Sequence, residues 1–168
     1  MTDFYIFRHG DTIETEDFLT RIFGHKHDSH NITILPKATT ALKRVGTFLK
    51  NVCIEANFCS PYIRCLESVQ IVGNVANIKY KLDERLRELE KKGETFSEFR
   101  DRVRSFLDEI RQKDYSKVSI CTHGAVIGAI KHLQLSGKLY FFQVYDYPPP
   151  GHLVIIKKGS VSQLDFNH

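Results

Sequence analysis

Two histidines occur where short apolar runs of the sequence end. Arg8 and His9 directly follow the run at residues 4–7, and His123 lies just beyond the run at residues 118–121. Residues 4–7 are apolar throughout and residues 118–121 except for Ser119, and short runs of this kind are typical of strands that are covered on both faces. Because ligands bind beyond the carboxyl ends of strands in open α/β sheets, we expect both imidazoles at one edge of a sheet.

Further polar and cationic groups are expected at the same edge. Ser60 ends another predicted strand, and Arg64 lies one helical turn beyond it. Gly10 and Gly124 follow the two histidines and would let the backbone approach a ligand closely. Two guanidiniums, two imidazoles and the N-termini of helices favour an anion, and guanidinium matches phosphate oxygens in a bidentate manner. These residues therefore predict a pocket for a phosphoryl group.

The elements that must position these residues alternate along the chain. Helices are predicted where apolar residues recur at helical spacing, and strands where short runs are apolar or alternate. The alternation predicts an α/β fold, a three-layer sandwich with a mainly parallel sheet, helices on both faces and an antiparallel edge strand or hairpin near the C-terminus. The predicted strands are 4–7, 57–60, 78–82, 118–121, 141–145, 153–156 and 160–166, and the predicted helices are 38–49, 61–75, 99–110 behind a capping box at Thr95, and 125–133.

Length and composition restrict the class of protein. The sequence shows no linker or repeat, so residues 1–168 are expected to form a single domain. The 24 Lys and Arg against 20 Asp and Glu give a formal charge of +4, which is too small and scattered to predict nucleic acid binding. No apolar run approaches the ~20 residues that span a bilayer, so no membrane partner is expected. The four cysteines form no Cys-x-x-Cys pair, and with no signal peptide they predict reduced, mostly buried thiols in the cytoplasm.

Four short motifs occur in a fixed order on this predicted fold. Together they resemble the histidine phosphatase superfamily, the phosphoglycerate mutase-like group, and among its members the short single-domain phosphatase type. The resemblance covers nearly the whole chain. The motifs are Arg8-His9-Gly10-Asp11-Thr12, Ser60-Pro61-Tyr62-Ile63-Arg64, Leu86-Arg87-Glu88 and Thr122-His123-Gly124.

This resemblance implies a role for each candidate site residue. His9 would be the nucleophile that forms a phosphohistidine, Glu88 the general acid and base, and His123 a third catalytic group on the phosphoryl oxygens. No metal and no cofactor would be needed, as in a cofactor-independent histidine acid-type phosphatase. The implied phosphate-binding residues are Arg8, Arg64, Thr12, Ser60 and Gly124, of which Thr12 and Ser60 could instead have plain capping roles.

Elementary chemistry agrees with the roles of His9 as nucleophile and Glu88 as proton donor. An imidazole is nucleophilic only when neutral, its ordinary pKa is about 6.5, and neighbouring arginines disfavour its protonated form. A departing alkoxide needs a proton, which Glu88 could supply. Glu88 lies in a highly charged stretch, however, and could be one more solvated charge, in which case Glu84 or Glu94 would be the acid.

Three further histidines, His25, His27 and His30, lie in the polar, irregular stretch of residues 11–35. Their spacing suggests metal ligands, but no cysteine or carboxylate pattern beside them supports a metal site. We favour a loop without metal that could line the pocket entrance.

The most consistent function is hydrolysis of a phosphomonoester, with a phosphorylated small molecule or a phosphoprotein as substrate. A protein phosphohistidine phosphatase and a phosphoglycerate-type mutase are the alternative enzymes, and a phosphate-binding module is the non-enzymatic one. The short chain argues against a mutase, which must close its phosphorylated intermediate off from water. The physiological substrate and the oligomeric state stay open at this stage.

Overall fold

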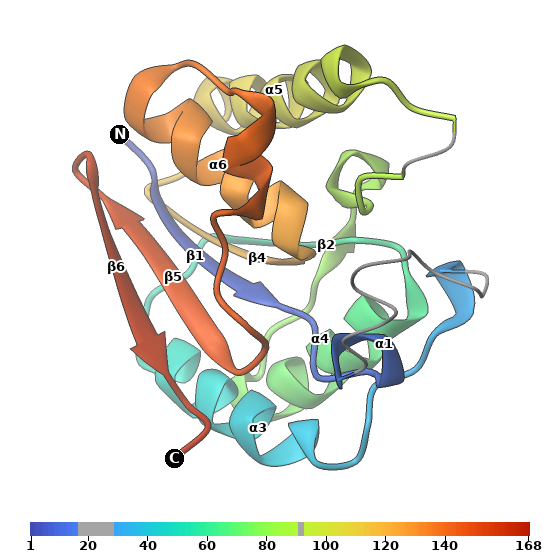
Figure 1. Ribbon diagram of the computed structural model, residues 1–168. Coiled ribbons are helices and arrows are strands. Elements are labelled where there is room, and N and C mark those ends of the chain that lie inside the picture. The colour runs from blue at the N-terminus through green and yellow to red at the C-terminus, as the bar shows by residue number, and fades with distance from the viewer. Residues whose placement is uncertain (17–28, 91–92) are drawn as a thin grey trace.

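One mixed sheet of six strands forms the centre of the computed structural model, which describes residues 1–16, 29–90 and 93–168. The order of the strands across the sheet is β3-β2-β4-β1-β5-β6 (Figure 1). The pairings of β3 with β2, β2 with β4 and β4 with β1 are parallel, whereas β5 is antiparallel to both β1 and β6. The predicted sheet with its antiparallel C-terminal hairpin is thus confirmed. The strands are β1 (Asp3–Arg8), β2 (Ala56–Cys59), β3 (Lys81–Leu82), β4 (Lys117–Thr122), β5 (His152–Lys157) and β6 (Ser160–Asp165).

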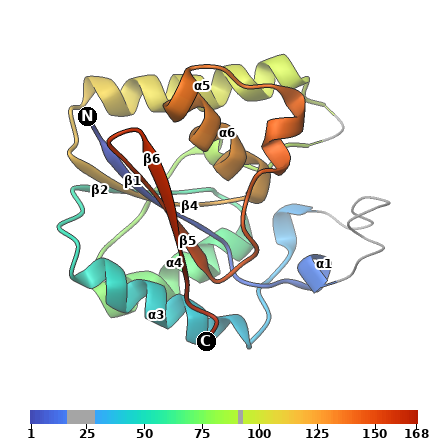
Figure 2. The same cartoon turned by 60° about the vertical axis from the view of Figure 1, so that its left-hand side comes forward.

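Helices cover both faces of this sheet, which confirms the three layers. On one face lie α3 (Ala38–Lys50) and α4 (Ile63–Ala76), and on the other lie α5 (Phe96–Gln112) and α6 (Gly124–Ser136) (Figures 1 and 2). Alternate residues of β1 enter the two cores, so that Ile6 packs with α5 and α6 while Phe7 packs with α3 and α4. This two-sided burial is the reason why residues 4–7 of β1 are continuously apolar. The shorter elements are α1 (Ile13–Glu16) and the 3₁₀ helices η1 (Ser29–Asn31), η2 (Glu84–Leu86) and η3 (Phe141–Tyr145).

The prediction of a strand at residues 141–145 is wrong, because this segment forms η3. Phe142 and Tyr145 are exposed, so the aromatic run does not enter the core from both sides as a central strand would. The side-chain oxygen of Gln143 accepts a hydrogen bond from the backbone N–H of Tyr140 at 2.8 Å and starts the turn. The C-terminal hairpin therefore consists of β5 and β6, and residues 141–145 add no strand to the sheet.

The strand predicted at residues 78–82 is shorter than expected, since only Lys81 and Leu82 pair with β2. The backbone N–H of Ile78 instead donates to the carbonyl of Gly73 at the end of α4, at 3.1 Å. The hydroxyl of Tyr80 contacts the hydroxyl of Ser119 at 3.0 Å, so this side chain points inward. Contacts with α4 and the core therefore replace sheet pairing in the first half of the segment.

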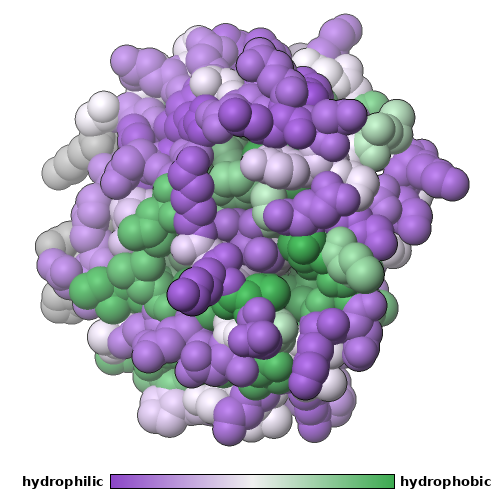
Figure 3. Space-filling model, turned by 180° about the vertical axis from the view of Figure 1, so that it is seen from behind, coloured by the Kyte–Doolittle hydropathy of each residue, from purple (hydrophilic) through white to green (hydrophobic). Residues whose placement is uncertain are grey.

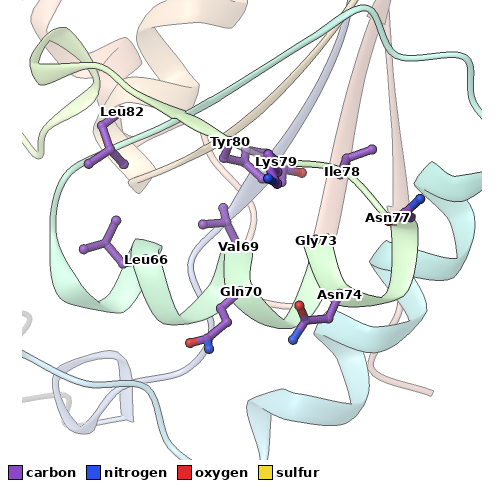
Figure 4. Close-up of a pocket in the computed structure, with 10 residues that line it drawn as sticks. All are labelled: Leu66, Val69, Gln70, Gly73, Asn74, Asn77, Ile78, Lys79, Tyr80 and Leu82. Atoms are coloured by element: carbon purple, nitrogen blue, oxygen red, sulfur yellow. The ribbon is translucent and has the colours of Figure 1, made fainter.

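A surface groove of about 810 Å³ lies between α4 and residues 77–82 (Figure 4). Its lining combines apolar side chains with amides, and it contains none of the residues of the four sequence motifs. Figure 3, a view from behind, shows hydrophobic side chains across the middle of the molecule between hydrophilic upper and lower parts. This groove is therefore separate from the candidate functional residues of the four motifs.

Two further expectations concern the cysteines and the membrane. All four cysteines are free thiols, and three of them, Cys59, Cys65 and Cys121, are buried whereas Cys53 is exposed, in agreement with the predicted reduced, mostly buried thiols. None of the helices in the described part of the chain combines the length and the hydrophobicity that crossing a bilayer requires.

Candidate active site

Backbone hydrogen bonds hold the ends of three strands together just beyond the sheet. The N–H of His9 donates to the carbonyl of Thr122 at 3.1 Å, and the N–H of Ser60 donates to the carbonyl of Cys121 at 3.0 Å. Because β1 and β4 are parallel neighbours, with Arg8 beside Thr122, the following residues His9 and His123 are also neighbours. Their ring centroids lie 5.2 Å apart.

Arg64, from the first turn of α4, lies between these two imidazoles. Its Nε donates to Nε2 of His9 at 3.1 Å, and one of its terminal nitrogens lies 3.0 Å from Nδ1 of His123. The exposed fractions of His9, Arg64 and His123 are 2%, 2% and 0%. The structure thus brings together three residues that are 55 or more positions apart in the sequence.

The hydrogen bonds of His9 determine which of its ring nitrogens carries the proton. Nδ1 lies 2.9 Å from the carbonyl oxygen of Gly10, which can only accept, so Nδ1 is protonated. Nε2 receives a hydrogen bond from Arg64, which can only donate, so Nε2 is unprotonated and its lone pair accepts this hydrogen bond. His9 is therefore a neutral imidazole whose lone pair lies on the nitrogen beside Arg64.

The surroundings of His9 favour this neutral form. Burial holds the pKa of His9 well below its ordinary value of 6.5, and the positive charges of Arg8 and Arg64 act in the same direction. A neutral imidazole at physiological pH is the form that can attack a phosphorus atom.

His123 is held by contacts on several sides. Since its Nδ1 faces a guanidinium that can only donate, its protonated nitrogen is Nε2, which donates to the hydroxyl oxygen of Ser60 at 2.7 Å. The ring of Tyr62 packs edge-to-face against it at a centroid distance of 5.0 Å. Ser60 therefore orients His123 in this structure.

Arg8 lies at the end of β1, with its guanidinium 5.1 Å from the ring centroid of Tyr147. That ring also packs on Gly124, where an added Cβ would lie 2.5 Å from ring carbons. Gly124 is the first residue of α6, so the positive end of this 13-residue helix also lies at the site. The absence of a side chain at Gly124 thus makes room for the aromatic ring that Arg8 stacks on.

Glu88 approaches the same group of residues from the segment after η2. Its Oε2 lies 3.7 Å from Nδ1 of His123, and its Oε1 accepts from the N–H of Leu89 at 3.0 Å. Arg102 of α5 donates to the backbone carbonyl of Glu88 at 3.0 Å. The Thr122 hydroxyl donates to the carbonyl of Leu86 at 2.7 Å, which fixes this segment to the end of β4.

The two alternative acids lie elsewhere. Glu84 is exposed on η2. The side chain of Glu94 is 5% exposed and binds Arg102 at 2.5 and 2.8 Å and Arg87 at 3.0 Å. Both oxygens of this carboxylate are therefore engaged by guanidinium groups. Of the three glutamates considered, Glu88 is the one with a contact to His123.

Thr12 is buried near the start of α1, and its hydroxyl accepts from the N–H of Thr15 at 3.3 Å. The N–H of Thr12 donates to the Thr15 hydroxyl at 2.8 Å. These contacts are those of a helix cap, one of the two roles that the sequence left open for this residue.

His30 lies against the candidate site, whereas His25 and His27 lie outside the described residues. The His30 ring stacks on Tyr62 at a centroid distance of 4.2 Å, and its Nε2 lies 3.1 Å from Oε1 of Glu90. Within the described residues, no group of three or more His, Cys, Asp and Glu side chains could hold a metal ion.

Several residues that shape the site were missed by sequence reasoning. Ser68 accepts from the N–H of Gly10 at 2.9 Å and donates to the carbonyl of Arg64 at 2.6 Å, which ties α4 to the loop after β1. Its position one helical turn after Arg64 was a usable signal. Tyr62 lies inside a motif that was noted, but Arg102 gave no signal, because it is one of several arginines on an amphipathic helix.

Comparison with known proteins identifies the family. A family model described as "Histidine phosphatase superfamily (branch 1)" matches residues 4–91 and 89–161. The chain therefore belongs to the histidine phosphatase superfamily. A search of curated protein sequences gave no match.

Solved structures of phosphatases share this fold. The alpha-ribazole phosphatase from Shigella flexneri has a TM-score of 0.76 and 14% identity, with 99% of this chain and 96% of that chain covered. A phosphoserine phosphatase mutant from Entamoeba histolytica, in complex with phosphoserine, has a TM-score of 0.71 and 15% identity, with 99% and 97% covered. The protein histidine phosphatase SixA, complexed with tungstate, has a TM-score of 0.69 and 17% identity, with 98% and 97% covered. The family indicates a phosphatase or a phosphoglycerate mutase-like enzyme, and the neighbours show that its fold is shared.

Proposed function

We propose that the protein hydrolyses a phosphomonoester, of a small molecule or of a phosphoprotein, through a phosphohistidine intermediate on Nε2 of His9. The observation that carries this proposal is the hydrogen bonding of His9, which leaves a lone pair on Nε2 next to the guanidinium of Arg64. A nucleophile beside a permanent cation suits attack on an anionic phosphoryl group.

In the first step the Nε2 lone pair forms a bond to phosphorus, and the bond from phosphorus to the ester oxygen breaks. The leaving oxygen takes a proton from the carboxyl group of Glu88, which lies beside His123. The His9 ring becomes positively charged, and the carbonyl of Gly10 stabilises its Nδ1–H. The products are the alcohol, a phosphohistidine and the Glu88 carboxylate.

In the second step the Glu88 carboxylate takes a proton from a water molecule as the water oxygen attacks phosphorus. The bond between phosphorus and Nε2 breaks, and its electron pair returns to the ring. Phosphate leaves, His9 is again a neutral imidazole, and Glu88 is again protonated. Atoms and charges balance over the cycle without any co-reactant besides water.

The phosphoryl oxygens would be bound by Arg8, Arg64 and the backbone N–H groups at Gly124. His123 would bind them through Nδ1–H in its imidazolium form, because its Nε2–H is held by Ser60. Arg64 has five N–H donors and can exchange its contacts with imidazole for contacts with phosphate. The arginines supply the positive charge that a metal supplies in other phosphatases. We therefore expect turnover that EDTA does not inhibit.

Net hydrolysis is favoured over a phosphoglycerate-type mutase. Only residues 89–95 lie between Glu88 and α5, so little chain is available on this side to close the site against water. A protein phosphohistidine phosphatase would release an imidazole, which needs an acid less than an alkoxide does. The position of Glu88 beside His123 therefore favours a phosphomonoester.

Turnover of p-nitrophenyl phosphate by the wild type and by His9→Ala tests the proposal. We expect turnover by the wild type and a loss of at least ~1,000-fold in His9→Ala. Activity that survives His9→Ala would overturn the phosphohistidine mechanism. If no ester is turned over while vanadate still binds, the protein would instead be a phosphate-binding module.

We also propose that residues 1–168 form a single histidine-phosphatase-like domain. One sheet includes strands from Asp3 to Asp165, and its two apolar cores are shared by helices from both halves of the chain. Cooperative unfolding in one transition, followed by two spectroscopic probes, would support this organisation.

A further inference from the structure

We propose that Tyr62 is a positioning residue for the general acid, and that its hydroxyl determines how well the enzyme handles poor leaving groups. The side chain connects the phosphate-binding side of the site to the segment that carries Glu88. This inference rests on the proposed hydrolysis through His9, and the experiment below separates the two.

One side of Tyr62 belongs to the phosphate-binding group. The residue is 2% exposed and immediately precedes α4. Its ring packs edge-to-face against His123 at 5.0 Å, and the guanidinium of Arg64 lies 5.0 Å from its ring centroid. Such contacts hold the ring through its faces and edges and do not involve the hydroxyl.

The other end of Tyr62 reaches the acid segment. Its hydroxyl donates a hydrogen bond to Oε1 of Glu90, two residues after Glu88. Nε2 of His30 lies 3.1 Å from the same oxygen, and the His30 ring stacks on Tyr62. The hydrogen bond from Tyr62 is the first cause of the lowered pKa of Glu90, so Glu90 is an ionised acceptor.

These contacts complete the support of Glu88. Arg102 holds the backbone carbonyl of Glu88 from the side of α5. The Tyr62–Glu90 hydrogen bond holds the same segment from the side of α4. Glu88 thus lies between two anchors, and the loss of either would let its carboxyl group drift from the position beside His123.

A displaced acid has a recognisable kinetic effect. Alkyl phosphates release a basic alkoxide and depend strongly on proton donation, whereas p-nitrophenyl phosphate releases a weakly basic phenolate that does not. Tyr62→Phe removes only the hydroxyl and keeps the ring contacts with His123 and Arg64. We expect kcat/KM for an alkyl phosphate to fall ~10-fold or more, with a change below ~3-fold for p-nitrophenyl phosphate and for vanadate inhibition.

Matched variants separate positioning from general damage to the structure. Tyr80→Phe removes a hydroxyl that contacts Ser119 in the core and lies outside the site, so it should leave the ratio of the two substrates unchanged. Glu90→Ala should reproduce the effect of Tyr62→Phe, and the double variant should be no worse than either single one. In a Glu88→Gln background, Tyr62→Phe should have no further effect on the alkyl phosphate.

The outcomes are distinct. Equal losses for both substrates, or a Tyr62→Phe effect that adds fully to that of Glu88→Gln, would overturn the positioning role while the proposed function stands. Should Tyr62→Phe fail to fold, Glu90→Ala tests the same role, because the Glu90 side chain is partly exposed. The ratio of kcat/KM for the alkyl phosphate to that for p-nitrophenyl phosphate again decides. An inactive wild type, or turnover that survives His9→Ala, would overturn the proposed function and this inference with it.

Discussion

The Nε of Arg64 donates a hydrogen bond to the Nε2 of His9 at 3.1 Å, and both residues are buried. A group that can only donate therefore faces the lone pair that the reaction uses. Because guanidinium is a planar fork of N–H donors, it can hold this nitrogen in place before the substrate binds and then turn its donors to the oxygens of an incoming phosphoryl group.

Arg64→Lys tests this geometry directly. A lysine keeps the charge but replaces the planar fork with a single flexible point charge, so it cannot contact both imidazoles. We predict that kcat/KM for p-nitrophenyl phosphate falls ~100-fold or more while the protein stays folded. Arg44→Lys, which changes an exposed arginine on α3, is the matched control. A loss of less than ~3-fold in Arg64→Lys would show that charge alone suffices.

Glu88→Gln tests the assignment of the general acid. Glutamine has nearly the same shape but cannot donate a carboxyl proton, so the loss should follow the basicity of the leaving group. We predict a decrease of ~100-fold or more for an alkyl phosphate and a smaller decrease for p-nitrophenyl phosphate. Steady-state rates on both esters provide the measurement, and small, equal losses would assign the acid to another residue.

Glu94→Gln should affect stability and leave the leaving-group dependence unchanged. The Glu94 carboxylate is buried between Arg87 and Arg102, and its neutralisation weakens charge-assisted hydrogen bonds. We predict that the free energy of unfolding in urea falls by about 1–3 kcal/mol. The alternative assignment, Glu94 as the acid, requires the opposite pattern of unchanged stability and a selective loss on alkyl phosphates.

The lowered pKa of His9 predicts how stability responds to acid. In the unfolded chain His9 has an ordinary pKa of about 6.5, whereas burial in the folded protein holds it well below that value. Below about pH 6.5 the unfolded state therefore binds a proton that the folded state does not, and the free energy of unfolding decreases as the pH falls.

His9→Asn removes this titration. We predict that the variant loses less stability than the wild type between pH 7 and pH 5, by an amount that approaches about 1.4 kcal/mol per pH unit. Urea unfolding at several pH values gives the comparison, with His168→Asn as a control because that side chain is 92% exposed. Parallel pH profiles for His9→Asn and the wild type would contradict a depressed pKa.

Gly124→Ala tests the support of Arg8. A Cβ at this position would overlap the Tyr147 ring, so the ring must move and Arg8 loses its stacking partner. We predict weaker inhibition by vanadate, by roughly 5- to 10-fold, because one phosphate-binding guanidinium is no longer fixed. Unchanged inhibition would mean that Arg8 is positioned independently of Tyr147.

Much of the fold could be predicted from local patterns. Residues 4–7 are apolar without interruption, and residues 118–121 are apolar except for Ser119, because both faces of β1 and β4 are covered. The capping box at Thr95 and Glu98 forms as its sequence indicates. Residues 141–145 could not be assigned in this way. Consecutive aromatic residues fit a buried strand as well as an exposed turn, and the packing of η3 against α6, not local preference, decides between them.

The residues of the candidate site could be predicted where they belong to one of the four sequence motifs. The meeting of His9 with His123 follows from the parallel pairing of β1 and β4, which the alternation of strands and helices implies. The hydrogen bond between Tyr62 and Glu90 could not be predicted, since it depends on where the segment after η2 places Glu90 relative to the residue that precedes α4. The orientation of His9 likewise depends on a contact with the adjacent Gly10 carbonyl that no pattern of residue types reveals.

Trapping of the phosphorylated enzyme tests the central claim most directly. The wild type would be mixed with ³²P-labelled substrate, quenched in alkali, in which phosphohistidine is stable, and digested to peptides for mass spectrometry. We predict one labelled phosphoryl group on His9 of the wild type and none in His9→Ala. Addition of unlabelled substrate before the quench should remove the label from His9. Steady turnover by the wild type without label on His9, or label on another residue, would contradict the proposed mechanism.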